Sequence, residues 1–414
     1  MNLRVGTSFG HRWSGHRLVT LALACVLALA TAGCANLLRQ PAPPGSAPQA
    51  VMSGFTGIRY LPLTDPVPFR DVLIAAFHNE TAENYETQLD GTRVYSYLSV
   101  SGGGSDGAFG AGLLNGWSKA GGRPKFKIVT GVSTGALIAP FAFLGSAYDE
   151  PLKESYTTID ARRIFLRHSL LALIWSEAAT DSAPLQELVS SYIDDKLLDA
   201  IAVEHAKGRR IYVATTNLDA EQPVIWDMGA IASSKNPARL KLFRQILVAS
   251  ASIPAVFPPV LLDVTVDGHR YDEMHVDGGV FFQSFSIGAA ADLPGAIAAA
   301  HPDFTGKVVQ RLYVIRNGWV SPDPDQVNRS LMAISLRAIG TMLKVSGIND
   351  LYRLYLSCLH DNVEFNYVSI PPDYKPLTKE QFDKAEMNQE FTYGEQLALK
   401  GISWRHLPPG YSPK

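Results

Sequence analysis

The amino-acid sequence predicts an α/β fold, a three-layer sandwich in which helices cover both faces of a mostly parallel central sheet. Three β-prone runs support this prediction, at residues 94–100, 125–130 and 210–216. The first two runs are each followed by a glycine-rich turn and a helix-prone segment, which is the order found in parallel sheets. In such folds the functional residues gather at the carboxyl ends of the strands.

The chain begins with a segment typical of an export signal, residues 1–33. Arginines give it a positively charged start, and residues 18–30 form an apolar run that is short for a membrane span. Ala32-Gly33-Cys34 resembles the lipobox of bacterial lipoproteins, in which the cysteine becomes the lipid-modified N-terminus. Thr31 departs from that pattern, because a leucine is usual there. The alternative is an ordinary secretory signal cut near Ala32.

Lipidation of Cys34 predicts an exported bacterial lipoprotein, attached to the outer membrane and facing the periplasm or the cell surface. Residues 34–56 are rich in Pro, Ala, Gly and Ser and predict an extended tether. Residues 57–91 form a lead-in segment to which no chemistry is assigned. The globular pattern starts at residue 92, and residues 319–414 show helical apolar spacing that predicts a helical extension packed on the same body.

Composition excludes several classes of protein. The three cysteines are Cys25, which leaves with the signal, Cys34, which would be lipidated, and Cys358, so no disulfide framework is expected. With 46% hydrophobic residues in 414, the chain can build a large core instead. A formal net charge of -2 and the lack of a basic run in the mature chain argue against a nucleic-acid partner.

A candidate nucleophile follows the second β-prone run. Gly131-Val-Ser133-Thr-Gly135 matches the Gly-x-Ser-x-Gly pattern of a nucleophile elbow, in which small residues allow a sharp turn that exposes the serine. The helix expected after the turn, over residues 136–142, would favour negative charge at its first turn. A purely structural glycine turn between strand and helix is the alternative.

A candidate anion-binding loop follows the first β-prone run, at Gly102, Gly103, Gly104 and Ser105. Glycines leave backbone N–H groups uncovered, so that these groups can converge on an anion. A dinucleotide site is excluded because no carboxylate ends the next strand, and a phosphate-binding P-loop is excluded because Gly-Lys-Ser/Thr is lacking. The remaining interpretations are an oxyanion hole, in which the N–H groups hold the oxygen of a tetrahedral intermediate, and a structural turn.

A candidate base is Asp277, which stands before Gly278 and Gly279 at the end of a short β-prone run. The two glycines permit a sharp turn that aims the carboxylate across the sheet. A serine hydroxyl reacts only when a base takes its proton, and an ordinary carboxylate is a weak base at neutral pH. We therefore expect Asp277 within hydrogen-bond reach of Ser133, in a water-poor site that raises its pKa.

The alternative to this pair is a Ser-Asp-His triad that uses a later histidine. His360, next to Asp361, is the least implausible candidate of that kind. His275 is expected to be structural, with assistance in catalysis as its alternative. Asp272 and Glu273 are expected to be solvated.

The segment between the elbow and the later strands is helix-prone over residues 149–199. Its stretch 164–175 is apolar enough to line an acyl pocket or to contact lipid, although an apolar helix is most often part of the core. Residues 210–216 and 224–227 predict two strands joined by a turn, and residues 238–250 predict a helix.

The motifs together resemble those of the bacterial patatin-like phospholipases. The resemblance rests on Gly102–Gly104, the elbow 131–135, Ala-Ser-x-x-x-Pro-x-x-Phe-Pro-Pro at 249–259, and Asp277-Gly-Gly, in that order. It covers residues 92–318 and implies a catalytic domain with those bounds. One position departs from the family: Asp106 stands where Arg or Lys is usual, which weakens the expectation of a preference for anionic head groups.

The resemblance implies a Ser-Asp dyad with Ser133 as nucleophile and Asp277 as proton acceptor, and it implies an oxyanion hole at Gly102–Ser105. Gly131, Gly135, Gly278 and Gly279 are implied as turn glycines, and no metal or other cofactor is implied. The expected function is that of a membrane-anchored serine acyl hydrolase that cleaves lipid carboxylic esters through an acyl-enzyme. The alternatives are an acyltransferase that uses the same dyad and a non-catalytic lipoprotein that binds a lipid or a partner.

Overall fold

The computed structural model describes residues 39–64, 67–158, 166–167, 180–287 and 292–412. The chain divides into two compact units, residues 1–40 and residues 41–414. The predicted export signal and Cys34 lie outside the described residues, as does most of the apolar stretch 164–175.

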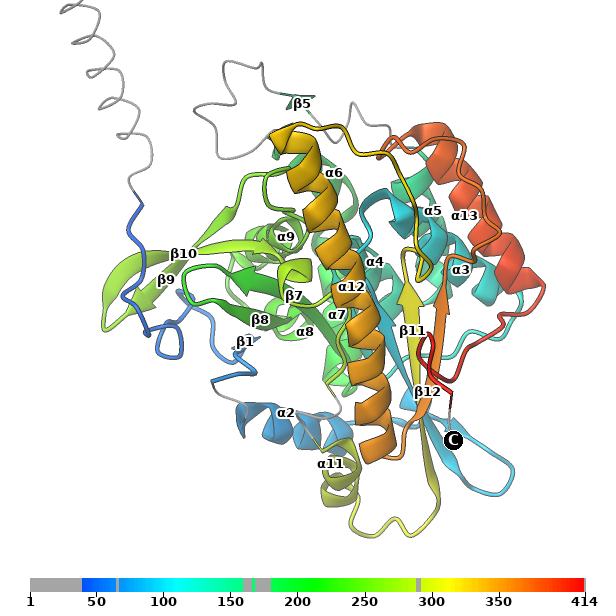
Figure 1. Cartoon of the computed structure of the whole chain (residues 1–414). Coiled ribbons are helices and arrows are strands. Elements are labelled where there is room, and N and C mark those ends of the chain that lie inside the picture. The colour runs from blue at the N-terminus through cyan, green and yellow to red at the C-terminus, as the bar shows by residue number, and fades with distance from the viewer. Residues whose placement is uncertain (1–38, 65–66, 159–165, 168–179, 288–291, 413–414) are drawn as a thin grey trace, which may run out of the picture. The chain divides into compact units, whose positions relative to one another are not determined.

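Within the described ranges, ten strands of the larger unit form one mixed sheet, whose main path runs β1-β8-β7-β4-β3-β11-β12 (Figure 1). The strands β2, β9 and β10 pair at its sides, and β5 (Leu166–Arg167) pairs with β6 (Thr180–Asp181) in a separate ribbon. The ten strands are β1 (Arg59–Tyr60), β2 (Glu86–Thr87), β3 (Arg93–Val100), β4 (Ile128–Val132), β7 (Arg210–Asn217), β8 (Gln222–Asp227), β9 (Val260–Val266), β10 (His269–Asp277), β11 (Val308–Arg316) and β12 (Glu364–Ser369).

The centre of the sheet is parallel, as predicted. The strands β7, β4, β3, β11 and β12 pair in parallel with their neighbours. The other five strands pair antiparallel, among them β8, which returns from β7 through a short turn. Because parallel neighbours point the same way, the carboxyl ends of these central strands lie at one edge of the sheet.

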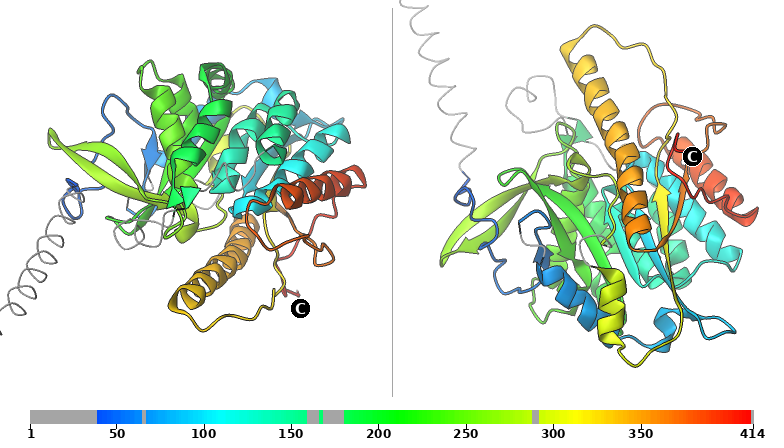
Figure 2. Two further views of the ribbon diagram at one scale, coloured as in Figure 1. Left: turned by 90° about the horizontal axis from the view of Figure 1, so that it is seen from above. Right: turned by 60° about the horizontal axis from the view of Figure 1, so that its bottom comes forward.

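Helices cover both faces of this sheet, as Figure 2 shows from above. Adjacent residues of a strand point to opposite faces, and the two hydrophobic cores follow this alternation: Leu98 and Val213 belong to one core, and Tyr97 and Tyr212 to the other. The helices are α2 (Val67–His78), α3 (Gly107–Lys119), α4 (Thr134–Leu144), α5 (Asp149–Thr157), α6 (Ala183–Tyr192), α7 (Asp195–Ala206), α8 (Met228–Ser233), α9 (Arg239–Ser250), α11 (Leu293–Ala300), α12 (Leu331–His360) and α13 (Lys384–Leu399).

The two faces are covered by different parts of the chain. Side chains of α3, α4, α7, α8 and α9 join the first core, and those of α2, α11 and α12 join the second. The three-layer α/β class predicted from the sequence is therefore confirmed. Cys358 lies in the second core as a buried free thiol. Within the described ranges, no helix is long and apolar enough to cross a bilayer.

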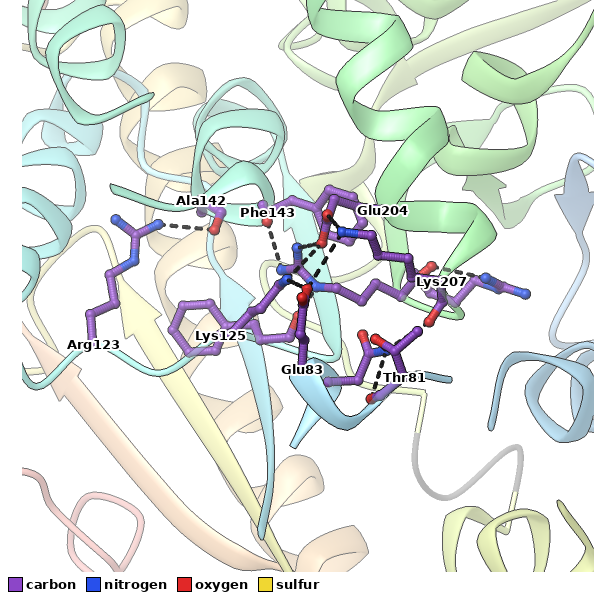
Figure 3. A network of polar contacts seen from close by, with 12 residues as sticks. Thr81, Glu83, Arg123, Lys125, Ala142, Phe143, Glu204 and Lys207 are labelled. Atoms are coloured by element: carbon purple, nitrogen blue, oxygen red, sulfur yellow. Dashed lines mark hydrogen bonds and ion pairs between the residues drawn. The ribbon is translucent and has the colours of Figure 1, made fainter. Parts of the chain in front are cut away.

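A network of ion pairs and hydrogen bonds lies at the end of the sheet away from these carboxyl ends, where β4 and β7 begin (Figure 3). Glu204 on α7 pairs with Arg209 at 2.8 Å, Lys207 at 2.9 Å and Lys125 at 3.1 Å. Burial alone would raise the pKa of Glu204, but hydrogen bonds from these cations lower it to about 2. Arg209 also donates to the Phe126 carbonyl, so the network stabilises the edge away from the candidate site.

The structure differs from the predicted extended tether over residues 41–56, which are packed in the larger unit. Ala47, Ala50, Met52 and Phe55 are buried in the first core. Residues 41–56 also form backbone bridges to β9 and β10, such as Val51 with Thr265. These apolar residues pack because the edge of β9 offers unpaired backbone groups and a hydrophobic face.

Two further differences concern the strands. The strand β12, which follows β11 and pairs with it in parallel, was not predicted. The apolar alternation of Phe365 and Tyr367 in β12 is short and lies between two long helical patterns. The strand β9 was also not predicted, since Asp263 interrupts its apolar residues.

Candidate active site

Ser133 stands at the apex of a sharp turn between β4 and α4. Its backbone has φ 56° and ψ −126°, a conformation that costs free energy for a non-glycine residue. A Cβ at Gly131 would lie 2.3 Å from the Gly135 carbonyl oxygen, and one at Gly135 would lie 2.2 Å from that of Val100. Only glycine fits at these two positions, so the Gly-x-Ser-x-Gly sequence folds into the elbow that its pattern predicts.

A contact that the sequence did not predict supports this elbow. The Ser133 backbone N–H donates to the Ser250 hydroxyl at 3.0 Å, and that hydroxyl donates to the Ala214 carbonyl at 2.7 Å. Ser250 is the last residue of α9 and belongs to the Ala-Ser-x-x-x-Pro segment. This segment therefore ties the strained turn to β7.

Asp277 ends β10 and lies against Ser133. Its carboxyl lies close enough to the Ser133 side chain for hydrogen bonding from that side chain to lower its pKa, and it accepts a hydrogen bond at 2.7 Å from the Gly279 backbone N–H. A Cβ at Gly278 would lie 2.5 Å from the Ala214 carbonyl oxygen, which explains why glycine follows the aspartate. Ser133 is 5% exposed and Asp277 is 4% exposed. The structure thus joins the two candidate residues in a dry site.

Burial has a large effect on the Asp277 carboxyl. It raises the pKa of this group to about 7, although the hydrogen bonds from Ser133 and Gly279 act in the opposite direction. A carboxylate with a pKa near neutrality is a far better proton acceptor than an ordinary aspartate. The surroundings of Asp277 therefore meet the chemical demand placed on a base.

The glycine loop follows β3 and leads into a short 3-10 turn, Gly104–Asp106. Within the described structure, the N–H groups of Gly103, Gly104 and Ser105 have no hydrogen-bond acceptor. A Cβ at Gly103 would lie 2.0 Å from the Asn317 carbonyl oxygen, and Gly104 has φ +60°. These N–H groups are free to receive an oxyanion.

Gly102 differs from the rest of the loop. Its N–H donates to the Gln283 carbonyl oxygen at 3.1 Å, so it is not available to an oxyanion. Gly102 therefore belongs to the loop without supplying a donor. Its contribution is steric, since a Cβ there would lie 2.5 Å from Gln283 Oε1 and 3.2 Å from the Ser133 side chain.

Two polar residues near the loop were missed by sequence reasoning. Asn317, directly after β11, donates from its backbone N–H to the Ser101 hydroxyl and from Nδ2 to the Ser101 carbonyl, both at 2.8 Å. Gln283 donates from Nε2 to the Gly279 carbonyl at 3.2 Å. Both residues come from segments remote in sequence from the loop, and no local pattern marks them.

Two cavities meet at Ser133. The first is apolar and lies among α4, α6 and α9. Its lining includes Leu137, Phe141, Leu185, Leu188, Val189 and Phe257. The second is wider, has more polar and charged residues in its lining than the first, and lies between the glycine loop, Asp277 and α12. We refer to them below as the apolar pocket and the polar cleft. An apolar pocket was expected from residues 164–175, and in the described structure α6 supplies much of it.

The histidines do not support a triad. Among the described residues, no histidine lines the apolar pocket or the polar cleft. His275 is fully buried, with Nδ1 2.9 Å from the Thr215 hydroxyl and Nε2 3.2 Å from Glu273. The side chain of His360 is 84% exposed and lies against Asp361.

Glu273 corrects another expectation. It was expected to be solvated, but it is 1% exposed and pairs with Arg59 at 2.7 Å. Arg59 comes from β1, in the lead-in segment, so a distant part of the chain neutralises the carboxylate. No group of three or more His, Cys, Asp or Glu side chains in the described part of the chain could hold a metal ion.

Comparison with protein-family models places this geometry in context. Residues 98–290 match the model described as patatin-like phospholipase. This stretch of the chain is therefore similar to patatin-like phospholipases. This patatin-like domain includes the glycine loop, Ser133 and Asp277, whereas Arg316, Asn317 and α12 follow it in sequence. No curated protein matches the chain.

Several solved structures are similar to this chain at low identity. VipD from Legionella pneumophila is 11% identical, with a TM-score of 0.37 and coverage of 77% of this chain and 70% of that protein. Human GIVD cytosolic phospholipase A2 is 10% identical, with a TM-score of 0.29 and coverage of 82% and 63%. The type III effector ExoU is 15% identical, with a TM-score of 0.19 and coverage of 75% and 54%. The chain thus spans about half to two thirds of the length of the latter two.

Proposed function

We propose that this protein is a serine acyl hydrolase that cleaves carboxylic esters of membrane lipids, as a phospholipase A or a lysophospholipase does. The patatin-like phospholipase domain supports a lipid-hydrolysing enzyme. The observation that carries the finer proposal is that Ser133 lies within hydrogen-bonding range of Asp277 at the junction of an apolar pocket and a polar cleft. A lipid ester has the matching shape, with its carbonyl between an acyl chain and a polar alcohol.

The proposed reaction begins when Asp277 accepts the proton of the Ser133 hydroxyl. The serine oxygen then attacks the ester carbonyl carbon, and the N–H groups of Gly103 and Gly104 stabilise the oxyanion that forms. Collapse of this intermediate breaks the ester bond, and the leaving alcohol takes the proton from Asp277. The acyl group is now bound to Ser133.

Deacylation repeats these steps with water. Asp277 accepts a proton from water, the hydroxide attacks the acyl carbonyl, and the released serine oxygen regains the proton. The apolar pocket holds the acyl chain throughout, since each buried CH₂ contributes about 0.8 kcal/mol of binding free energy. An acyltransferase differs only in the acceptor at this step, so analysis of the products separates the two activities.

The dyad is tested with Ser133→Ala and Asp277→Asn. We expect each variant to lose hydrolysis of medium-chain p-nitrophenyl esters by about a thousandfold or more, because each removes a group that acts in the transition state. Fluorophosphonate should label the wild type at Ser133 and fail to label Ser133→Ala. Matched controls are Ser191→Ala and Asp303→Asn, which change exposed residues that line neither cavity.

Two outcomes contradict this proposal. Retained turnover in either dyad variant would show that the Ser133–Asp277 pair does not carry out the reaction. A folded wild-type protein that neither hydrolyses esters nor reacts with fluorophosphonate would favour a non-catalytic protein that binds a lipid or a partner. Circular dichroism of each variant verifies that lost activity is not lost folding.

The proposal includes membrane attachment through lipidated Cys34. It is supported by the sequence alone, in which a positively charged start and an apolar run precede Ala32-Gly33-Cys34. Attachment would place a lipid hydrolase next to its substrate. The proposed location of the protein is the outer membrane, on the side that faces the periplasm or the cell surface.

A further inference from the structure

The polar cleft contains cations that the patatin-like domain does not supply. Arg316 lies at the end of β11, and Arg337 and Lys344 lie on α12. All three follow residue 290, where the match to the family model ends. Arg337 and Lys344 are seven residues apart, which is about two helical turns, so they share one face of α12.

The cleft-facing side of α12 leaves room for a ligand. Gly340 lies between the two cationic residues and also lines the cleft. A Cβ at Gly340 would have no atom within 4 Å, so the helix surface is open there. Figure 1 shows α12 crossing in front of the sheet beside β11, the strand that carries Arg316.

Arg316 is a buried cation that forms no ion pair with any residue that the structure describes. Its side chain is 5% exposed, and Nε has no hydrogen-bond partner among the described residues. Nη2 donates to the Lys344 carbonyl at 3.3 Å, and Gly347 makes room for the guanidinium, since a Cβ there would lie 1.9 Å from Nη1. A buried charge is costly unless an anion or hydrogen bonds compensate it.

Three carboxylates also line the cleft, at Asp106, Asp277 and Asp323, and each is engaged by other groups. Asp323 pairs with Lys379 at 3.3 Å, its charge also acts on Lys344, and its backbone carbonyl accepts a hydrogen bond from Arg337. Asp277 is engaged with Ser133. Burial and then Glu386 raise the pKa of Asp106, while Arg316 and Lys344 lower it, so Asp106 lies within the field of both cations.

Asp106 is the residue at which the sequence departs from the family pattern. It stands in the glycine loop at the position where the resembling family has Arg or Lys, and it lines the polar cleft. The positive charge missing from the loop is thus present on β11 and α12, next to the same position. The weakened expectation of a preference for anionic head groups was based on the loop alone, without these cations.

The two cavities fix the direction in which a lipid ester would lie. With its acyl chain in the apolar pocket and its carbonyl at Ser133, the alcohol part of the ester extends into the polar cleft. We propose that Arg316, Lys344 and Arg337 bind a phosphate group carried by that alcohol, so that the enzyme prefers anionic glycerophospholipids to uncharged glycerides. This inference rests on the proposed function and names the substrate class of the same site.

The test compares three soluble short-chain esters: diheptanoyl phosphatidylglycerol, diheptanoyl phosphatidylcholine and dioctanoylglycerol. We expect wild-type kcat/KM to be highest for the phosphatidylglycerol and at least about tenfold lower for the glyceride. The preference should shrink in 0.5 M NaCl, because salt screens charge interactions. Competitive inhibition by inorganic phosphate would show that phosphate itself is recognised, and inhibition confined to glycerophosphoglycerol would show that the whole head group is needed.

Variants assign the preference to the cations. Lys344→Gln and Arg337→Gln should each lower the ratio of kcat/KM for phosphatidylglycerol to that for dioctanoylglycerol, by about tenfold where the cation touches the phosphate. The double variant should lower the ratio further, and Asp106→Asn should raise it because an opposing carboxylate is removed. Lys235→Gln and Arg270→Gln, at exposed positions away from the cleft, are the matched controls and should keep the wild-type ratio.

The outcomes separate this inference from the proposed function. Hydrolysis of all three esters with equal kcat/KM, or an unchanged ratio in the double variant, would overturn the inference and leave the hydrolase in place. If no ester is hydrolysed, calorimetric binding of the same three compounds to the folded protein tests the cleft directly. Binding of the glyceride as tight as that of phosphatidylglycerol would then overturn it.

Discussion

At the scale of single residues, the site depends on a carboxylate that the fold keeps away from water. Asp277 is 4% exposed, and burial raises its pKa to about 7 in spite of two hydrogen bonds that favour the ionised form. The ionised form is the one that can accept the Ser133 proton. Protonation of Asp277 therefore switches the proposed chemistry off.

This gives a prediction for the pH dependence of activity. Below the pKa, the fraction of ionised Asp277 falls tenfold per pH unit, so kcat/KM for a neutral ester should fall tenfold per unit below about pH 7 and level off above it. Initial rates between pH 5 and pH 9, with a substrate that does not itself titrate, measure the profile. The Asp303→Asn control should keep it. A profile that stays flat down to pH 5 would mean that the pKa of the base is not raised.

The residues of the site differ in how far the sequence could predict them. Ser133 and Asp277 were predictable because each is flanked by glycines whose close backbone contacts are local requirements. Ser250 and Asn317 were not, because they act through contacts with segments 117 and 216 residues away. A serine at a helix end and an asparagine after a strand are too common to identify on their own. The acceptor of the Gly102 N–H was not predictable, since only the fold shows where this group points.

At the scale of elements, α3 is held against α13 by backbone contact. A Cβ at Gly112 would lie 1.9 Å from the Phe391 carbonyl oxygen, and one at Gly116 would lie 2.3 Å from that of Glu395. On the other helix, Gly394 faces the Phe109 carbonyl in the same way, at 2.4 Å. Because α3 follows the glycine loop directly, α13 positions the loop through this contact.

We expect Gly112→Ala to destabilise the protein by about 1–3 kcal/mol, because the added methyl forces the two helices apart. Urea unfolding followed by circular dichroism measures the effect. Gly340→Ala is the matched control, also within a helix but with open space around the added Cβ. That variant should be neutral or stabilised by up to about 1 kcal/mol. Equal stability of Gly112→Ala and wild type would show that the helices can separate without cost.

The elements themselves were predicted with uneven success. Strands such as β3 and β7 are recognisable in the sequence, because every one of their residues is partly or fully buried in the fold. The strand β12 and the packed residues 41–56 did not stand out, because their stability comes from neighbours that the sequence does not identify. Long-range pairing, rather than local preference, decides their structure.

At the scale of the whole molecule, the site is larger than the segment that matches the family. The segment that matches the family model contains the proposed dyad and the proposed oxyanion loop, while β11, α12 and the segment before α13 supply Arg316, Lys344 and Gln381. The sequence predicted that the residues after 318 pack on the same body, but it contained no sign that they line the site. The proposed chemistry and the proposed head-group preference therefore come from different parts of one unit.

The chain's first 40 residues form the other unit, and its proposed role is attachment. We expect Cys34→Ser to move the protein from the membrane fraction to the soluble fraction of a bacterial host, because the diacylglyceryl group needs the thiol of this cysteine. Fractionation, palmitate labelling and the mass of the mature N-terminus measure the change. Cys25→Ser is the matched control, since that cysteine leaves with the signal. Hydrolysis of a soluble ester should persist in released Cys34→Ser protein. A mature wild-type protein without attached lipid would point instead to an ordinary secretory signal.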